Sequence, residues 1–462
     1  MDIIIVGTGK VGYTLAEHLS REEHDVTVID TSDEALRRAS DALDVMCIDG
    51  NGASIEVLRE AGADHADILI AATGLDEVNI VCCLTAKRLG AKYTIARVRN
   101  QEYASDFESF RTLLGIDLLI NPEKSTAVEI SRLLRFPSAA KIEPFYRGRL
   151  ELMEFRAREE DFFVGKPLSL LSDQVKSLPI LFCAADRKGE LIIPNGTFVP
   201  RAGDRLYLIG APLGIHEFFK RIGRYAPQVK RVLIVGGGRI AGYLAAILSR
   251  MNMQVKLIER SEARCRQLSE RLPHCLVICG DGTDQELLDE EGMSDCDGFV
   301  ALTGRDEDNL LISLYAMQRQ VLKVVAKCGR QNYTNIVRDL GLDSVISPKT
   351  ITASRILQVV RGMTDSEGAV MNALYQIADG AAEAVEFTIS APARCLNIPL
   401  RDLPLKRDIL VAMIVHEGKT IVPEGSSVIR QGDTVILISP AQRIQDLSDI
   451  LEPSSLDREG ER

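Results

Sequence analysis

The stretch D-I-I-I-V-G-T-G-K-V-G at residues 2–12, followed by D-V-T-V-I-D at residues 25–30, decides the fold of this chain. Its order is an apolar run, a glycine-rich loop, and a second apolar run that ends on an acid. That order is typical of a strand, a tight turn, a helix and a second strand. Gly7 allows the turn, Gly9 lets a pyrophosphate approach the backbone, and Gly12 lets the helix pack closely on the sheet. The loop therefore predicts the phosphate-binding turn of a doubly wound α/β fold.

An acid at the end of the second predicted strand indicates the kind of ligand. Asp30 follows Gly7 by 23 residues, and a carboxylate there can accept both hydroxyls of an adenine ribose. It would repel a 2′-phosphate, so NADP is disfavoured, whereas NAD(H), ATP and ADP all present the same free ribose. Lys10, inside the loop, could bind a further phosphate, and a solvated charge in the first helical turn is an equally good interpretation.

The same pattern occurs a second time in the chain. V-L-I-V-G-G-G-R-I-A-G at residues 232–242 repeats the loop, and Q-V-K-L-I-E at residues 254–259 repeats the strand and its acid, now Glu259. The first glycines of the two loops are 229 residues apart, and so are the two acids. Ala241 replaces the third glycine, which is an accepted variant, and Arg239 stands where the first loop has its lysine. The agreement of both spacings indicates an internal duplication.

Each glycine loop opens a segment in which strands alternate with helices. Continuously apolar strands in such an alternation predict a parallel sheet covered on both faces. A strand-rich segment with turn signals follows each of them, without a glycine loop of its own. The predicted fold class is α/β, with two Rossmann-like doubly wound parallel-sheet domains, each followed by a small α+β module. The predicted bounds are 1–136 and 229–362 for the nucleotide domains, 141–224 and 371–453 for the small modules, and 454–462 for a polar tail.

Polar residues at the ends of the later strands extend the two candidate sites. Open α/β sheets bind ligands beyond the carboxyl ends of their strands, so we expect these residues to lie beside the ligand. A T-G-x-D-E-x-N motif ends the fourth strand of each copy, and a basic residue ends the fifth. The residues are Asp49, Gly50, Asn51, Thr73, Gly74 and Arg97 in the first copy, and Asp281, Gly282, Thr283, Thr303, Gly304 and Lys327 in the second.

Charge and hydropathy exclude several classes of partner. The net charge is −11, which argues against binding nucleic acid and against docking on anionic lipid. No run approaches the ~18 apolar residues needed to span a bilayer. The chain starts on a strand-like run without a basic segment before it, so we expect no signal peptide. Any action at a membrane would therefore require a partner.

Cysteine and histidine usage indicates neither a disulfide framework nor a metal site. The six histidines form no metal-binding motif, so we expect no metal. The ten cysteines are mostly isolated in the sequence, and we expect buried thiols in a reducing cytosol. Cys275 and Cys279 lie four residues apart in a strand-like run, which places them on one face of that strand.

The small modules lack a catalytic constellation. A dehydrogenase needs an acid, a base or a nucleophile poised against the nicotinamide, and no such cluster is found. Two nucleotide domains without a catalytic partner indicate a sensor and not an enzyme. A soluble NAD-dependent oxidoreductase remains the alternative from another class of protein.

The order of domains, the glycine loop with its acid, the T-G-x-D-E-x-N motif and the I-A-R end of the fifth strand resemble the Trk potassium-uptake protein A family. The resemblance covers essentially the whole chain. It implies RCK (or KTN) nucleotide domains and RCK-C modules in a cytoplasmic subunit, peripheral on the inner face of the cell membrane. That subunit binds NAD(H) or ATP/ADP at up to two sites and controls a membrane-embedded potassium transporter. Four chains would form a homotetramer with eight nucleotide domains in a ring. Regulation of a potassium efflux pathway stays open.

The resemblance also assigns cofactor contacts. In the first copy they are Gly7, Thr8, Gly9, Lys10, Val11, Asp30, Asn51, Thr73, Gly74 and Arg97; in the second they are Gly236, Gly237, Gly238, Arg239, Ile240, Glu259, Asp281, Thr303 and Lys327. The chain departs from the family pattern at Ala241, Glu259 and Lys327. These departures predict unequal affinities at the two sites.

Overall fold

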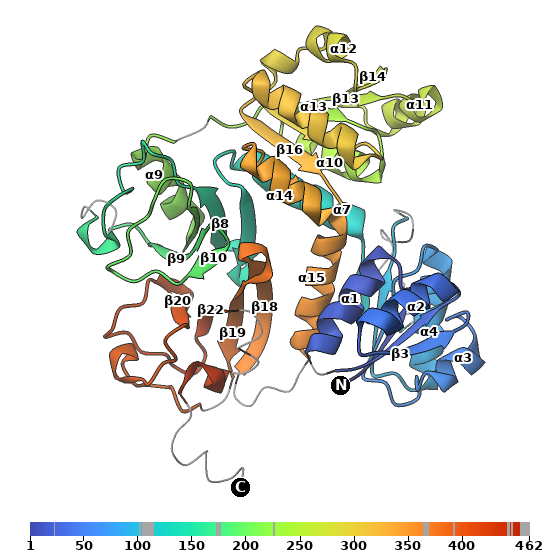
Figure 1. Ribbon diagram of the computed structural model, residues 1–462, viewed down its shortest axis with the longest axis horizontal. Helices are drawn as coiled ribbons and strands as arrows, with labels where there is room; N and C mark the ends of the chain where they lie inside the picture. Colours follow the sequence, from blue (N-terminus) through green and yellow to red (C-terminus); the bar gives the residue numbers. More distant parts are fainter. Residues whose placement is uncertain are drawn as a thin grey trace. The chain divides into compact units, whose positions relative to one another are not determined.

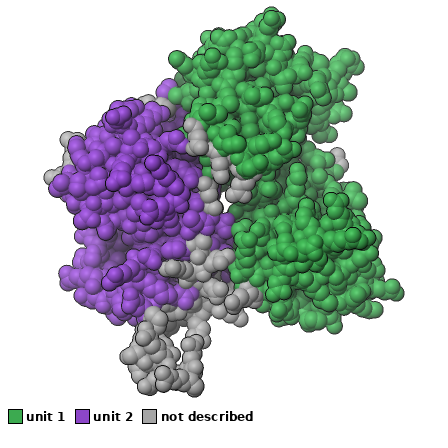
Figure 2. Space-filling view, viewed as in Figure 1, with its two compact units in different colours: residues 1–134, 229–357 green, residues 135–228, 358–462 purple. Residues whose placement is uncertain are grey.

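The computed structural model describes residues 1–22, 24–100, 103, 115–171, 177–224, 227–363, 369–390, 393–440, 444 and 447–452. Contacts divide the chain into two compact units, shown in Figure 2. Unit 1 comprises residues 1–134 and 229–357, and unit 2 comprises residues 135–228 and 358–462. Each unit therefore combines one segment from each half of the duplicated chain. The four predicted domain bounds stay a prediction, and the predicted polar tail lies outside the described residues.

The first copy, at the N-terminus of unit 1, is a six-stranded parallel sheet with the order β3-β2-β1-β4-β5-β6 (Figure 1). The order reverses between β1 and β4, which is where open α/β sheets leave a crevice for a ligand. Its strands are β1 (Asp2–Val6), β2 (Asp25–Asp30), β3 (Met46–Asp49), β4 (Ile68–Ala71), β5 (Tyr93–Arg97) and β6 (Leu118–Ile120); its helices are α1 (Lys10–Arg21), α2 (Asp33–Ala42), α3 (Ile55–Glu60), α4 (Asp76–Leu89) and α7 (Pro122–Arg135).

The second copy, also in unit 1, has the same strand order, β14-β13-β12-β15-β16-β17, and all its strand pairs are parallel. The two sheets confirm the doubly wound α/β fold that the glycine loops predict. The strands are β12 (Arg231–Val235), β13 (Gln254–Glu259), β14 (Cys275–Cys279), β15 (Gly298–Ala301), β16 (Lys323–Lys327) and β17 (Val345–Ile346); the helices are α10 (Arg239–Arg250), α11 (Glu262–Arg271), α12 (Gln285–Glu290), α13 (Asp306–Gln318), α14 (Gln331–Asp339) and α15 (Pro348–Arg361).

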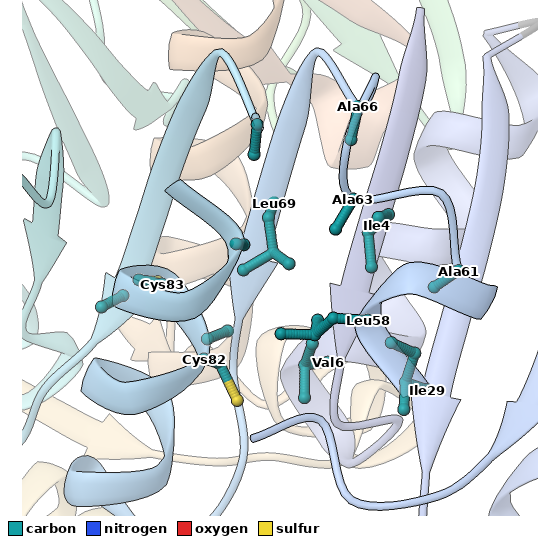
Figure 3. Packing of buried hydrophobic residues seen from close by; sticks show 14 of the residues in the cluster. Ile4, Val6, Ile29, Leu58, Ala61, Ala63, Ala66, Leu69, Cys82 and Cys83 are labelled. Atoms are coloured by element: carbon teal, nitrogen blue, oxygen red, sulfur yellow. The ribbon is translucent and has the colours of Figure 1, made fainter. Parts of the chain in front are cut away.

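The central strands of each sheet are apolar on both faces because helices cover both. Ile4 and Val6 of β1 and Leu69 of β4 are at most 2% exposed. Figure 3 shows them packed against Leu58 of α3 and Cys82 of α4. Burying a side chain of this size contributes about 1.5–3 kcal/mol. This packing holds the strand ends that carry the candidate site residues.

Unit 2 contains two five-stranded antiparallel sheets, ordered β10-β9-β11-β8-β7 and β18-β19-β22-β20-β21 (Figure 1). The first is built from β7 (Lys141–Phe145), β8 (Leu150–Arg156), β9 (Ile180–Arg187), β10 (Glu190–Ile192) and β11 (Arg205–Gly210), with helix α9 (Pro212–Arg221); the second is built from β18 (Ala369–Ile377), β19 (Ala382–Ile389), β20 (Leu410–His416), β21 (Lys419–Ile421) and β22 (Thr434–Pro440). After β22, the described part of the second module includes a short 3-10 helix at Leu447–Ile450.

The two small modules share one hydrophobic core. The fully buried Tyr207 of the first module accepts a hydrogen bond on its hydroxyl from the backbone N–H of Ala378 in the second, at 3.0 Å. The rings of Phe145 and Tyr375 meet edge to face, with centroids 4.9 Å apart. The sequence predicted two similar modules but not that they would pack on each other.

The part of the chain that the structure describes contains no helix long and apolar enough to cross a membrane.

Candidate functional site

The first glycine loop crosses the carboxyl end of β1 and leads into α1. Gly7 has a φ of +96°, and a Cβ there would lie 2.9 Å from the backbone nitrogen of Thr73, so the loops after β1 and β4 are in contact. A Cβ on Gly9 would meet nothing within 4 Å, whereas one on Gly12 would lie 1.8 Å from the carbonyl oxygen of Gly7. The middle glycine is thus open to a ligand, and the third permits the close approach of α1.

The carboxylate of Asp30 holds the first loop in place. Its Oδ2 accepts hydrogen bonds from the backbone nitrogen of Thr8 at 2.6 Å and from the hydroxyl of Thr8 at 2.8 Å. Its Oδ1 accepts one from the backbone nitrogen of Ser32 at 3.0 Å. A carboxylate offers about four lone-pair positions, so little acceptor capacity is left at Asp30. A ribose bound there would have to share the carboxylate with the hydroxyl of Thr8 or displace it.

The carboxylate of Glu259 plays the same part at the second loop with fewer bonds. It accepts from the backbone nitrogen of Gly237 at 2.7 Å and from that of Ser261 at 2.8 Å. A Cβ on Gly237 would lie 2.6 Å from Cδ1 of Leu268 and 2.9 Å from Oε2 of Glu259, so these two side chains occupy the space that a side chain at position 237 would need. Glutamate with glycine thus replaces aspartate with threonine, and more acceptor capacity remains free.

Two arginines that the sequence did not single out hold the glycine loops from the helices that follow β2 and β13. Nη2 of Arg38, on α2, donates to the carbonyl oxygen of Thr8 at 3.1 Å, and its guanidinium lies 4.7 Å from the ring centre of Tyr13. Nε of Arg264, on α11, donates to the carbonyl oxygen of Gly237 at 2.9 Å. The two arginines occupy different positions in their helices, so no repeated spacing marks them in the sequence.

The asparagine of the T-G-x-D-E-x-N motif is structural. Asn79 is fully buried; its Oδ1 accepts from the backbone nitrogen of Thr73 at 2.8 Å, and its Nδ2 donates to the carbonyl oxygen of Arg97 at 2.8 Å. In the second copy Asn309 makes the same two bonds, at 2.8 and 3.0 Å. The side chain therefore joins the end of β4 to the end of β5 and shapes the site without facing it.

The aspartate of the motif has a similar role. The buried carboxylate of Asp76 accepts from the backbone nitrogens of Arg99 at 2.9 Å and Asn100 at 2.7 Å. In the second copy Asp306 accepts from the backbone nitrogen of Gly329 at 2.9 Å. These bonds orient the segments that directly follow β5 and β16, next to the basic residues that end the two strands.

The basic residues that end β5 and β16 point back to the β4 and β15 loops. Arg97 donates through Nη1 to the carbonyl oxygen of Thr73 at 3.1 Å, and Lys327 donates through Nζ to that of Thr303 at 2.5 Å. Among the described residues, the buried Nε of Arg97 has no hydrogen-bond partner. An unpaired buried donor is costly, so this nitrogen is a place where an anionic ligand would be stabilised.

Each loop cation lies close to the strand-end cation of the other copy. Burial lowers the pKa of Arg97, and the positive charges of Arg99 and Arg239 lower it further against the opposing charges of Glu123 and Asp76. Burial likewise lowers the pKa of Lys327, and the charge of Lys10 adds to that effect against the opposing charge of Asp306. A hydrogen bond of 3.0 Å from Asn121 to the hydroxyl of Tyr243 also joins the two copies. The two candidate sites of unit 1 are therefore electrostatic neighbours.

The strand register of β3 and β14 does not match Asp49 with Asp281, the first acid named at the end of each strand. The two residues are offset by two positions. Asp49 pairs with Asp30 in the register of the first sheet, and Cys279 pairs with Glu259 in that of the second. The structural counterpart of Asn51 is Asp281, because each accepts a 3.0 Å hydrogen bond from the backbone nitrogen two residues later.

Within the described ranges, no group of three or more His, Cys, Asp or Glu is placed to hold a metal ion. The thiol prediction needs a correction. Cys82, Cys83, Cys183, Cys265, Cys328 and Cys395 are buried and Cys47, Cys275 and Cys296 are half-buried, but Cys279 is exposed. Cys279 is the last residue of β14, at the rim of the second site.

Two doubly wound sheets, each with a glycine loop held by an acid at its carboxyl edge, define a tandem α/β protein of the dinucleotide-binding type. Its sequence matches the TrkA-N domain over residues 3–122 and 232–348 and the TrkA-C domain over residues 384–452. The chain belongs to the Trk system potassium uptake protein TrkA family.

Individual relatives cover almost the whole chain. A TrkA homolog of Methanosarcina mazei ("homolog 2") is 35% identical over 460 residues, which is 98% of this chain and 100% of that protein. The TrkA protein of Halomonas elongata is 35% identical over 458 residues, covering 98% and 99%. The solved structure of the GsuK channel bound to NAD has a TM-score of 0.61 at 18% identity, covering 95% of this chain and 77% of that one. That likeness shows a shared fold.

Proposed function

We propose that this chain is the regulatory subunit of a potassium uptake system, and that it senses adenine nucleotides without consuming them. The observation that carries the proposal is the pair of acid-held glycine loops at neighbouring strand edges, in a chain whose relatives are named potassium uptake proteins. The described parts of the two small modules bring their sheets into one hydrophobic core.

In the proposed binding mode the acid of each copy takes the adenine ribose. The loop and the first turn of the following helix present backbone N–H groups to the phosphates. The contacts proposed are those named from the sequence, from Gly7 to Arg97 in the first copy and from Gly236 to Lys327 in the second. The wider free capacity of Glu259 favours the second copy for a ribose that offers both hydroxyls.

Phosphates would also act between the copies. Lys10 lies near Lys327, and Arg239 lies near Arg97, so each pair of like charges repels when no anion is present. Bound phosphates would neutralise that repulsion and favour one arrangement of the two copies over another. A ligand controls an assembly only through such a difference in affinity between two arrangements.

The same proposal extends to the partner and the assembly. The chain would act on a membrane-embedded potassium transporter from the cytoplasmic face, as a tetramer that places eight nucleotide domains in a ring. The family name supports the transporter, whereas the tetramer and its ring are carried over from the expectation that the sequence resemblance gave. Mass photometry of the detergent-extracted complex would count the chains per transporter.

Potassium flux through the reconstituted transporter tests the function. We expect flux to change when NADH, ATP and ADP are exchanged, and a non-hydrolysable ATP analogue to act like ATP. Flux that tracked hydrolysis or NADH oxidation would replace the sensor with an enzyme. Flux that responded to no nucleotide would overturn the proposal.

Calorimetry with NADH and NADPH tests the choice of ligand. We propose that both sites disfavour NADP because an acid faces the 2′ position. Arg38 and Arg264 sharpen this test, since an arginine near that position can accommodate a 2′-phosphate. NADPH that bound as tightly as NADH would refute the proposed discrimination against NADP and would assign the 2′-phosphate to the two arginines.

A further inference from the structure

Two thiols meet at the adenosine end of the second site. Sγ of Cys265, in the first turn of α11, donates to the carbonyl oxygen of Glu259 at 3.2 Å and lies 3.9 Å from that of Ile278. Sγ of Cys279, the last residue of β14, lies 4.0 Å from the carbonyl oxygen of Arg260. The sulfurs thus contact consecutive carbonyl groups at the end of β13. Burial raises the pKa of Cys265 to about 11, and the neighbouring thiol of Cys279 adds to that rise.

The pair is asymmetric in exposure and confined to one copy. Cys265 is 7% exposed, whereas Cys279 is open to solvent. Leu36 takes the place of Cys265 in the first copy, because each follows its helix-capping serine by four residues and donates its backbone N–H to that serine. Asp49 takes the place of Cys279 in the strand register. The first site therefore has no equivalent thiols.

We propose that Cys265 and Cys279 form a reversible disulfide that weakens nucleotide binding at the second site and leaves the first site unchanged. The cysteine pair is a modification site whether or not a nucleotide binds. The effect of the disulfide on nucleotide binding rests on the proposed function.

A peroxide can act as the oxidant. The thiolate of Cys279 attacks one peroxide oxygen, the O–O bond breaks, and the departing hydroxide takes a proton to become water, leaving a sulfenic acid. The sulfur of Cys265 then attacks that sulfur; the S–S bond forms, the S–O bond breaks, and the proton of Cys265 leaves with the oxygen as a second water. The two thiols have then supplied two electrons and two protons, and a dithiol reductant reverses the change by supplying the same.

The bond would displace the elements that hold the acid. An S–S bond measures about 2.05 Å, shorter than any hydrogen-bonded contact between two thiols, so the first turn of α11 and the end of β14 must approach each other. That turn carries Ser261, whose backbone nitrogen binds the carboxylate of Glu259, and Arg264, which binds the loop at Gly237. We expect binding at the second site to weaken roughly 5- to 150-fold, the usual size of a coupling between sites.

Peptide mass spectrometry of the full-length protein after hydrogen peroxide and alkylation tests the chemistry. We expect a linked pair of peptides carrying Cys265 and Cys279, which dithiothreitol separates. Cys279→Ser, at an exposed position, should abolish the link, and Cys275→Ser, on the same strand, should keep it. A stable sulfinic or sulfonic acid at Cys279 without a link, or a link between other cysteines, would overturn the proposal.

Calorimetry with ADP on the same samples tests the consequence. The reduced protein should bind two nucleotides per chain, the oxidised protein should lose affinity at one site, and Cys279→Ser should keep both after peroxide. A disulfide that formed while both affinities stayed the same would sink the switch and leave the proposed function intact. A reduced protein that bound no nucleotide would sink the proposed function, and the effect on binding with it, while mass spectrometry would still decide the disulfide.

Discussion

The two copies in unit 1 reach the same geometry with different side chains. In the first loop, Asp30 accepts from both the backbone and the hydroxyl of Thr8. In the second loop, Glu259 accepts only from the backbone nitrogen of Gly237, which has no side chain. At position 237 the space that a side chain would need is taken by Leu268 and by Glu259. The contact between acid and loop is thus preserved, although both of its partners have changed.

The supporting arginines show the same freedom. Arg38 and Arg264 reach the carbonyl oxygen at the same position of their loops, but from different turns of α2 and α11. By contrast, the asparagine that ties the fourth strand to the fifth makes the same bonds in both copies. Exposed sites tolerate several solutions, whereas a buried polar group allows few, because each unpaired donor or acceptor there costs about 1–3 kcal/mol.

The third loop position offers the largest test of this comparison. Gly12→Ala would place a Cβ 1.8 Å from the carbonyl oxygen of Gly7, yet the second copy buries Ala241 at that position. We expect Gly12→Ala to destabilise the first copy by about 3 kcal/mol, the upper end of overpacking costs, and to reduce ADP stoichiometry from two to one. Ala241→Gly should cost only about 1 kcal/mol, the helix propensity of alanine over glycine.

Hydrogen exchange within the full chain, read separately for β1 and β12, measures both effects. If β1 in Gly12→Ala and β12 in Ala241→Gly lost the same protection from exchange, the two loops would have the same backbone geometry. The alanine of the second copy would then need another explanation.

The buried asparagines should give the next largest effect, and an equal one. Asn79→Ala leaves the backbone nitrogen of Thr73 and the carbonyl of Arg97 without their partner, and Asn309→Ala does the same in the second copy. Each substitution should destabilise its own copy by about 2–3 kcal/mol. Hydrogen exchange of the backbone amides in β4 and β15 measures the loss of stability in each copy. If only one of the two substitutions destabilised its copy, the hydrogen bonds of Asn79 and Asn309 would not be equivalent.

The pairing of acid and loop residue predicts a smaller, non-additive effect. Asp30→Glu alone should weaken ADP binding at the first site by about 1–2 kcal/mol, because the longer acid meets the side chain of Thr8. Adding Thr8→Gly recreates the second-copy pair and should recover most of the loss. Calorimetry on the two single variants and the double variant completes the cycle. If the losses of binding free energy in the two single variants simply added in the double variant, the acid and the loop residue would not be coupled.

The sequence predicted what backbone geometry imposes. The glycine loops, the acids and the doubly wound sheets follow from steric and hydrogen-bonding rules that leave few alternatives, so both sheets were predicted. The binding residues named at their carboxyl edges stay a prediction. Arg38 and Arg264 were missed because a long side chain can reach one atom from several positions on a helix. The shared core of the small modules was missed because the apolar pattern of a strand indicates burial but does not say against what.

One interpretation from the motif was incomplete. The T-G-x-D-E-x-N motif looked like a binding signature, and its most buried members are instead structural, as the contacts of Asp76 and Asn79 show. Sequence pattern alone cannot separate a residue that touches a ligand from one that holds the strand end. Likewise, no local pattern in the sequence records that Cys279 is exposed.

The smallest effect we expect concerns Asp281, which stands where the first copy has Asn51. Hydrogen bonds from the backbone and the hydroxyl of Thr283 lower the pKa of Asp281. A carboxyl whose pKa falls on folding stabilises the protein above its unfolded pKa of about 3.9, and the contribution is lost as the pH falls through the lower folded value. Asp281→Asn keeps an acceptor for Thr283, as Asn51 does for its neighbour, and removes only the charge.

At pH 7 the variant should therefore be less stable by no more than about 0.5 kcal/mol, because the group is exposed and solvent screens its charge. Below about pH 4 the difference from the native chain should shrink, since the native carboxyl then loses its advantage by protonation. Paired thermal unfolding curves between about pH 3 and 7 measure the difference directly, with Asn51→Asp as the reverse exchange in the first copy. A difference that grew toward low pH would assign the hydrogen bonds of Thr283 to the neutral acid and contradict a lowered pKa at Asp281.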